Sequence, residues 1–325
     1  NQVNENVPGV YEVHYDVADG AGNSAAQLIR AVTVEDTTPP SLSLNGANDI
    51  TIECASPYSD AGATASDSCA GDVTGAISTD NQVNENVPGV YEVRYDVMDA
   101  SANPATQVVR TVTVEDTTPP SLSLNGANDI TIECALPYSD AGATASDSCT
   151  GDLTGAISTD NQVNENAPGV YEVRYDVMDA SANPATQVVR TVTVEDTAPP
   201  SILLNGLSAI TIECGSTYSD EGATASDGCS GDLTGSISTD NQVNANAVGV
   251  YSVLYDVMDG VGNTAAQMAR SVTVEDKTPP TVTLIGLSAI TIECGTSYTE
   301  KGAMASDACD GDVSGSVTID NQVNE

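Results

Sequence analysis

The sequence contains no phenylalanine and no tryptophan, so tyrosine supplies every aromatic side chain. Aromatic residues make up 4% of the 325 residues, whereas apolar residues as a whole make up 40%. Any core must therefore be built from Val, Ile, Leu, Ala and Tyr. Such a core is thin, and it suits small β-domains, in which β-branched and tyrosine side chains pack on a pleated sheet.

Basic residues are also scarce. Eight Lys and Arg stand against 47 Asp and Glu, and the formal net charge of -39 is spread along the chain. This charge argues against nucleic acid and anionic membrane surfaces as partners. No apolar run approaches the length of a membrane span, so we expect none in this segment. A surface this acidic favours either a very soluble, self-repelling rod or countercharge from divalent cations.

Recurring catalytic and zinc-binding motifs are missing as well. The single histidine, His14, lies in a segment that recurs along the chain, and the corresponding positions hold Arg94, Arg174 and Leu254. The sequence has no GxSxG nucleophile turn, no phosphate-binding loop and no HExxH zinc motif. Paired carboxylates are expected by chance in a chain with 47 acids. We therefore predict that the protein is not an enzyme.

What the sequence does contain is an internal repeat with a period of about 80 residues. The string NQVNE begins at Asn1, Asn81, Asn161 and Asn321, and NQVNA begins at Asn241. Residues 37–116 and 117–196 differ at only four positions, which indicates recent duplication. Acid-Thr-Pro-Pro strings, or close variants of them, mark the boundaries, because paired prolines stiffen a linker. They predict a half domain at 1–36, whole domains at 37–116, 117–196 and 197–276, and a further partial domain at 277–325.

Within each repeat the apolar pattern has a period of two. In GVYEVRYDVMD, Tyr91, Val93, Tyr95 and Val97 share one face, which is typical of a half-buried strand. Strands are also expected at 42–44, 50–54, 62–66, 76–79 and 106–114, separated by clusters of Gly, Pro, Asn and Asp. Six or seven short strands in each repeat predict a β-sandwich.

A set of motifs in fixed order extends this prediction. DTTPPSLSLNG, DITIEC, YSDAGATASD, GDVTG, PGVYEVRYDV and TVTVED together resemble the bacterial immunoglobulin-like surface repeat of pesticidal crystal proteins, which is similar to the hyalin repeat. The resemblance implies an all-β chain of tandem immunoglobulin-like sandwiches, arranged as beads on a string and used as a spacer, stalk or accessory module. The family's D-x-x-GN turn has Ala102 and Ala182 in the middle repeats where the outer ones have Gly22 and Gly262, which puts a turn with positive φ in doubt there.

Eight cysteines recur at one spacing, two in each repeat, and indicate an oxidising compartment. A hairpin that turns near residues 60–63 would bring the two cysteines of a repeat together. Such a bridge closes a loop of about 15 residues and contributes roughly 3 kcal/mol through chain entropy. We therefore predict disulfides inside the repeats. The expected pairs are Cys54 with Cys69, Cys134 with Cys149, Cys214 with Cys229, and Cys294 with Cys309.

The acidic residues predict calcium sites between domains. In a string of sandwiches the last strand starts at the end where the chain enters, so the turn before that strand lies beside the incoming linker. This places oxygen ligands of the kind calcium prefers close together. The expected groups are Asp36 with Asp99 and Asn103, Asp116 with Asp179 and Asn183, and Asp196 with Asp259 and Asn263. Alternatively, Asp99 and Asn103 only cap their own turn. The acidic turn at 67–72 is a second candidate for calcium.

These observations predict an extracellular or cell-surface protein that forms the structural repeats of a fibre, stalk or filament. Its expected partner is itself, as a homopolymer or a laterally associated fibre. The part domains at the two ends fit either a segment of a longer periodic chain or subunits that complete each other by strand exchange. The alternative function is an adhesin module that binds carbohydrate or another cell-surface partner.

Overall fold

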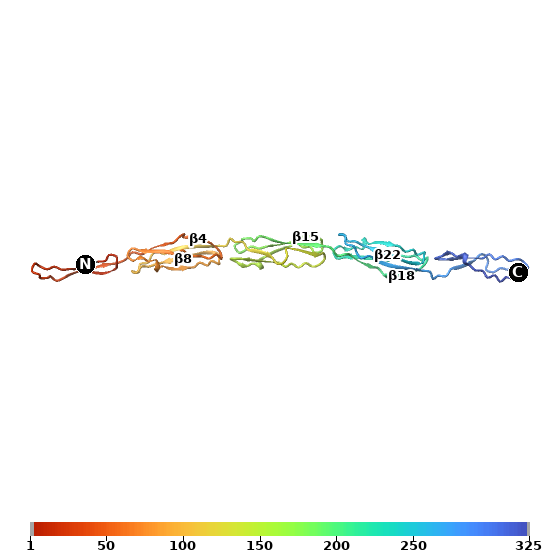
Figure 1. Ribbon diagram of the computed structural model, residues 1–325, viewed down its shortest axis with the longest axis horizontal. Helices are drawn as coiled ribbons and strands as arrows, with labels where there is room; N and C mark the ends of the chain where they lie inside the picture. The colour runs from red at the N-terminus through yellow and green to blue at the C-terminus, as the bar shows by residue number, and fades with distance from the viewer. Residues whose placement is uncertain (1–2, 324–325) are drawn as a thin grey trace. The chain divides into compact units, whose positions relative to one another are not determined.

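The computed structural model describes residues 3–323 and contains two compact units (Figure 1). The first is made of described residues from 1–128, 141–161 and 174–190, and the second from 129–140, 162–173 and 191–325. Repeat 37–116 lies wholly in the first unit and repeat 197–276 wholly in the second, whereas repeat 117–196 contributes to both.

Repeat 37–116 is a sandwich of two sheets, as the sequence predicts. One sheet has the strand order β3-β5-β6 and the other has the order β4-β9-β8-β7. The strands are β3 (Ser41–Leu44), β4 (Asp49–Glu53), β5 (Ala63–Asp67), β6 (Gly71–Asp72), β7 (Ser78–Asn81), β8 (Gly89–Asp96) and β9 (Val108–Glu115). A short 3-10 turn, η1 (Thr74–Ala76), precedes β7, so the strand expected at 76–79 begins two residues later.

Repeats 117–196 and 197–276 have the same elements in the same order. In the former these are β10 (Ser121–Leu124), β11 (Asp129–Glu133), β12 (Ala143–Asp147), β13 (Gly151–Asp152), η2 (Thr154–Ala156), β14 (Ser158–Asn161), β15 (Gly169–Asp176) and β16 (Val188–Glu195). In the latter they are β17 (Ser201–Leu204), β18 (Ala209–Glu213), β19 (Ala223–Asp227), β20 (Gly231–Asp232), η3 (Thr234–Ser236), β21 (Ser238–Asn241), β22 (Gly249–Asp256) and β23 (Met268–Glu275).

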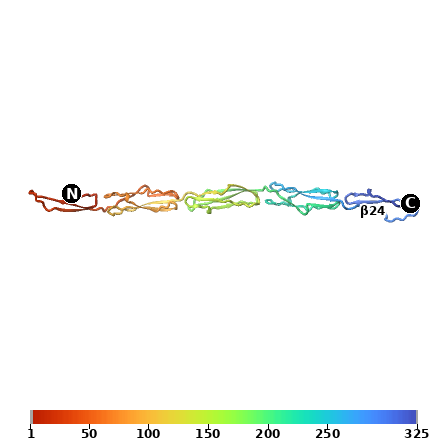
Figure 2. The ribbon, with the colours of Figure 1, turned by 60° about the horizontal axis from the view of Figure 1, so that its bottom comes forward.

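The two ends of the chain carry parts of the same pattern. Near the N-terminus, β1 (Gly9–Tyr15) pairs with β2 (Leu28–Val34), and near the C-terminus β24 (Thr281–Leu284), β25 (Ala303–Asp307), β26 (Gly311–Asp312) and η4 (Ser314–Ser316) follow one another (Figure 2). Residues 289–293, the equivalent of β4, form no strand. Because β4 is held by parallel pairing with β9, the segment 277–323, which has no equivalent of β9, leaves this stretch unpaired.

The core of repeat 37–116 confirms the period of two. Val93 and Tyr95 on β8 are 0% and 1% exposed, and they pack with Ala63 and Val112 from the neighbouring strands. Leu42, Ile52 and Tyr58 are among the partly buried side chains that complete the cluster. Repeat 197–276 builds the same cluster from Ala223, Val253, Tyr255 and Val272.

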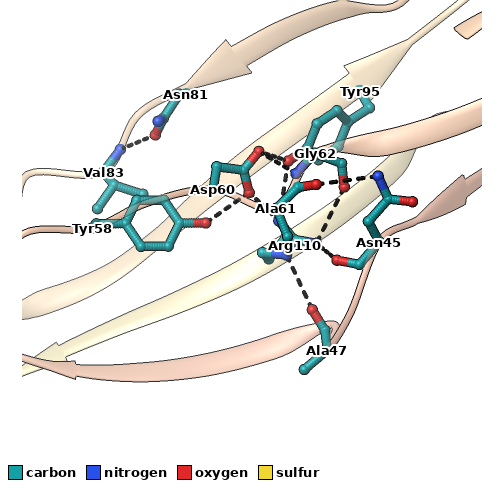
Figure 3. A network of polar contacts seen from close by, with 10 residues as sticks. All are labelled: Asn45, Ala47, Tyr58, Asp60, Ala61, Gly62, Asn81, Val83, Tyr95 and Arg110. Atoms are coloured by element: carbon teal, nitrogen blue, oxygen red, sulfur yellow. Dashed lines mark hydrogen bonds and ion pairs between the residues drawn. The ribbon is translucent and has the colours of Figure 1, made fainter.

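A fully buried arginine lies within this core. Arg110 lies on β9 in the inward register with Val112, and its side chain is 0% exposed. It forms an ion pair with Asp60 and donates hydrogen bonds to the backbone oxygens of Asn45 and Ala47 (Figure 3). Buried charges are stable only when they are paired and hydrogen-bonded, and Arg110 meets both conditions.

The carboxylate of Asp60 is the hub of this network. Burial tends to raise the pKa of Asp60, but hydrogen bonds from Tyr95 and Tyr58 and the charge of Arg110 outweigh burial, and the pKa lies below its usual value. The loop that carries Asp60 is thus held to β8 and β9 by polar contacts. Arg190 and Arg270 are equally buried at the equivalent positions.

The turn after β8 keeps its left-handed residue although glycine is absent. Ala102 and Ala182 have φ of 67°, in the region where Gly22 (φ 88°) and Gly262 (φ 105°) lie in the other repeats. The doubt raised by the sequence is therefore resolved: the turn has positive φ in all four copies. An alanine in this conformation is strained by about 1–2 kcal/mol, because its Cβ approaches the following carbonyl oxygen.

Replacing this alanine should stabilise the turn. We expect Ala102→Gly to raise the free energy of unfolding by about 1 kcal/mol, because glycine carries no Cβ to strain at positive φ. Ala100→Gly, in the same turn but at a residue without positive φ, is the matched control and should lower stability slightly. Thermal unfolding of the two variants measures the difference. A loss of stability in both would contradict the strain argument.

Candidate metal centre at the repeat junction

A glutamate at the end of β4 holds the linker that leaves repeat 37–116. Glu53 accepts hydrogen bonds from the backbone N–H groups of Thr117 and Thr118, at 2.9 and 3.1 Å, and from both of their hydroxyls. The bond from Thr117 N–H and those from the hydroxyls lower the pKa of Glu53. Glu213 binds the backbone of Lys277 and Thr278 in the same way. The chain segments between repeats are therefore anchored.

The cysteines join neighbouring repeats, and the predicted pairing within repeats is wrong. All three disulfides connect residues 95 positions apart. They are Cys54 with Cys149, Cys134 with Cys229, and Cys214 with Cys309. Each bridge therefore crosses a junction between two repeats.

The sheet topology explains why the two cysteines of one repeat do not meet. Cys54 follows β4 and its N–H donates to the carbonyl of Glu115, at the end where the chain leaves the repeat. β5 belongs to the other sheet and runs antiparallel to β3, so it carries the chain back toward the incoming linker before Cys69. The expected hairpin near residues 60–63 does not form, and the two cysteines lie at opposite ends of the repeat.

Cys69 and Cys294 carry free thiols, so their predicted bridges are absent. They occupy the positions of Cys149 and Cys54 in their own repeats. At the separation of 95 seen in the three bridges, the partner positions of Cys69 and Cys294 fall outside the 325-residue sequence.

Three aspartates meet beside two of the bridges, those that contain Cys149 and Cys229. At the junction between repeats 37–116 and 117–196 they are Asp116 of the linker, Asp147 at the end of β12 and Asp179 in the turn after β15, which we call the junction cluster. One carboxylate oxygen of each lies within 4.8 Å of the others. From the sequence we expected Asp116 and Asp179 to lie together, but we placed Asp147 in a separate candidate site.

Hydrogen bonds fix two of these carboxylates. Oδ1 of Asp147 accepts the N–H groups of Cys149 and Thr150 at 2.7 and 2.8 Å, which ties it to the disulfide. Oδ1 of Asp179 accepts the N–H of Asn183 at 2.9 Å, and its Oδ2 accepts the Asn183 amide. The same amide donates to the carbonyl of Asp116 at 2.9 Å. Asn183 therefore presents nitrogen to the cluster and positions it, whereas the sequence led us to expect an oxygen ligand.

The cluster is buried and its charge is not balanced. Asp116 and Asp147 are each 8% exposed and Asp179 is 6% exposed. Oδ1 of Asp116 and Oδ2 of Asp147 are buried and accept no hydrogen bond from any residue of the described range 3–323. Burial, together with the charges of Asp147 and Asp179, raises the pKa of Asp116. The cluster is therefore a candidate metal centre.

The arrangement recurs at two further junctions. Asn103 and Asn263 donate to the carbonyls of Asp36 and Asp196 as Asn183 does to that of Asp116. Unpartnered buried oxygens, within the part of the chain that is described, occur here on Asp67 and Asp196. The equivalent clusters are Asp36, Asp67 and Asp99, and Asp196, Asp227 and Asp259.

The chain is similar in sequence to two curated relatives. The chain is 32% identical over 94% of its length to hyalin of Lytechinus variegatus, and 28% identical over 81% of its length to pesticidal crystal protein Cry22Aa of Bacillus thuringiensis. It covers 60% and 36% of these relatives. Among solved structures, mouse protocadherin-24 EC1-3 aligns with 74% of this chain and 100% of its own length, at 13% identity and a TM-score of 0.30.

A family match completes the assignment. Residues 42–114, 122–194 and 202–274 each match the family described as bacterial surface protein, Ig-like domain. Within residues 3–323, no helix has the length and apolar character needed to cross a bilayer. The three matched segments cover more than half of the sequence, and the chain belongs to the bacterial surface Ig-like domain family.

Proposed function

We propose that the chain is the structural repeat region of a secreted or cell-surface fibre or stalk. The observation that carries this proposal is the set of disulfides between successive repeats. A bridge inside a domain stabilises that domain, whereas a bridge between domains also fixes how one follows the next. Persistent disulfides require an oxidising compartment, which agrees with an extracellular location.

The junctions and the surface charge support the same role. Glu53 anchors the linker, and two prolines restrict the backbone at Pro119 and Pro120. The charge of -39 keeps separate chains apart unless cations neutralise it. The partner that fits these properties is another copy of the chain, associated end to end or laterally through ions.

Labelling of native material tests this function. Gold-labelled antibody raised against repeat 197–276 should bind along extracellular filaments of the producing cells, at regular intervals set by the repeat. Label confined to the cell interior, or to isolated points at filament tips, would contradict a fibre built from these repeats. Strong and saturable binding of one repeat on a glycan array would support the alternative, a carbohydrate-binding adhesin module.

A further inference from the structure

The junction clusters concentrate negative charge where water is largely excluded. At the cluster of Asp116, Asp147 and Asp179, three carboxylates meet within 4.8 Å, and each side chain is at least nine-tenths buried. The charges that act most strongly on Asp116, those of Asp147 and Asp179, are both negative. Like charges held this close in a buried place repel one another strongly unless a positive charge lies between them.

The unpartnered oxygens point to the missing charge. Asp116 Oδ1 and Asp147 Oδ2 are buried and receive no hydrogen bond from residues 3–323. A buried carboxylate oxygen without a partner is unfavourable, and native proteins normally satisfy such groups. At the junction between repeats 117–196 and 197–276, both carboxylate oxygens of Asp196 are buried and unpartnered within the same range.

We propose that each of the three aspartate clusters binds one calcium ion. All the donors are oxygens, which selects a hard cation. Magnesium usually keeps several waters and takes one or two carboxylates, whereas calcium accepts more carboxylates and bidentate binding. Three carboxylates that converge at one point fit calcium better. Asp116, Asp147 and Asp179 are the ligands at one junction, with their equivalents at the other two.

The site is organised before the ion arrives. Backbone N–H groups of Cys149 and Thr150 hold one oxygen of Asp147, and those of Ser181 and Asn183 hold one oxygen of Asp179. These bonds fix how each carboxylate is turned. Asp116 comes from the linker, so the ion joins the linker to the repeat that follows it. Calcium binding here does not depend on the fibre function, so either proposal can fail alone.

Equilibrium dialysis of the full oxidised chain against calcium tests the proposal. The buffer contains about 0.15 M NaCl, which weakens diffuse binding to surface acids. We expect three saturable calcium ions per chain, and two for Asp179→Asn. Asp176→Asn is the control three residues away, because Asp176 is exposed and bonds only to Gln187 among the contacts described for it. This control should keep all three ions.

A second variant tests the site without disturbing the fold. Asp116→Asn removes charge from a carboxylate whose Oδ1 has no partner within residues 3–323, so the fold should persist while the count of bound calcium falls from three to two. Circular dichroism checks the fold of both variants. The proposal is overturned if no saturable calcium binds, if folded Asp116→Asn still binds three ions, or if an equal concentration of magnesium displaces the calcium.

Discussion

At full extension, the distance between Cys54 and Cys309 is expected to be about one-seventh as long in the oxidised chain as in the reduced chain. The reason is the shortest covalent path. The bridge from Cys54 leads to Cys149, a short stretch of backbone leads back to Cys134, and the next bridge leads to Cys229. A second stretch of the same length then leads back to Cys214, which is bridged to Cys309.

Chain geometry gives the magnitudes. The reduced backbone from Cys54 to Cys309 extends to about 870 Å, at roughly 3.4 Å per residue. The oxidised path contains only the two short backbone stretches and three bridges, and it extends to about 120 Å. Single-molecule force spectroscopy, with handles fused to both ends, measures these lengths before and after addition of a reductant.

A variant that lacks one bridge is the matched control. In Cys134→Ser with Cys229→Ser, the path must follow the backbone from Cys149 to Cys214, so the full extension should be intermediate, at about 230 Å. Bridges inside repeats would instead allow about 690 Å in the oxidised chain. An oxidised extension near that value would refute the pairing between repeats.

Loss of the buried arginine is expected to have the largest effect of any single substitution in a repeat. Arg110→Met should lower the free energy of unfolding of repeat 37–116 by about 3–5 kcal/mol, because it leaves the largely buried Asp60 carboxylate without its cation. The backbone oxygens of Asn45 and Ala47 also lose their donor. Differential scanning calorimetry of the full chain should show one transition moving to lower temperature.

Arg94 provides the comparison on the adjacent strand. It pairs with Glu92, but its side chain is 38% exposed, and exposed ion pairs contribute about 0–1 kcal/mol. Arg94→Met should therefore change the calorimetric trace little. If the two variants lose the same stability, the buried network around Asp60 does not support the fold as argued.

The strands could be predicted because apolar alternation is a local property of the sequence, and the two-sheet fold followed from the number of short strands and from the family resemblance. Alternation in GVYEVRYDV places Val93 and Tyr95 on one face, and both are buried as expected. Arg110 was missed, although its signal was available. It follows Val108 and precedes Val112 at intervals of two, and the same position carries Arg30, Arg190 and Arg270, so an inward-facing arginine could have been inferred.

The disulfide pairing could not be predicted from spacing. In a strictly periodic chain, partners within one repeat and partners in neighbouring repeats produce the same sequence pattern. The choice depends on which sheet β5 joins, and that depends on tertiary contacts. For the same reason, the sequence did not place Asp67 with Asp99. Asp67, whose carboxylate accepts the Cys69 N–H, lies with Asp36 and Asp99 at the end where the incoming linker enters the repeat.

The overlap of the three bridged loops makes the chain tolerant of proteolysis. The loops 54–149, 134–229 and 214–309 together include every peptide bond between Cys54 and Cys309. A protease that cuts once anywhere in this range leaves two fragments that are still covalently joined. Separating Cys54 from Cys309 requires at least three suitably placed cuts or a reductant, so damage to one repeat does not detach what lies beyond it.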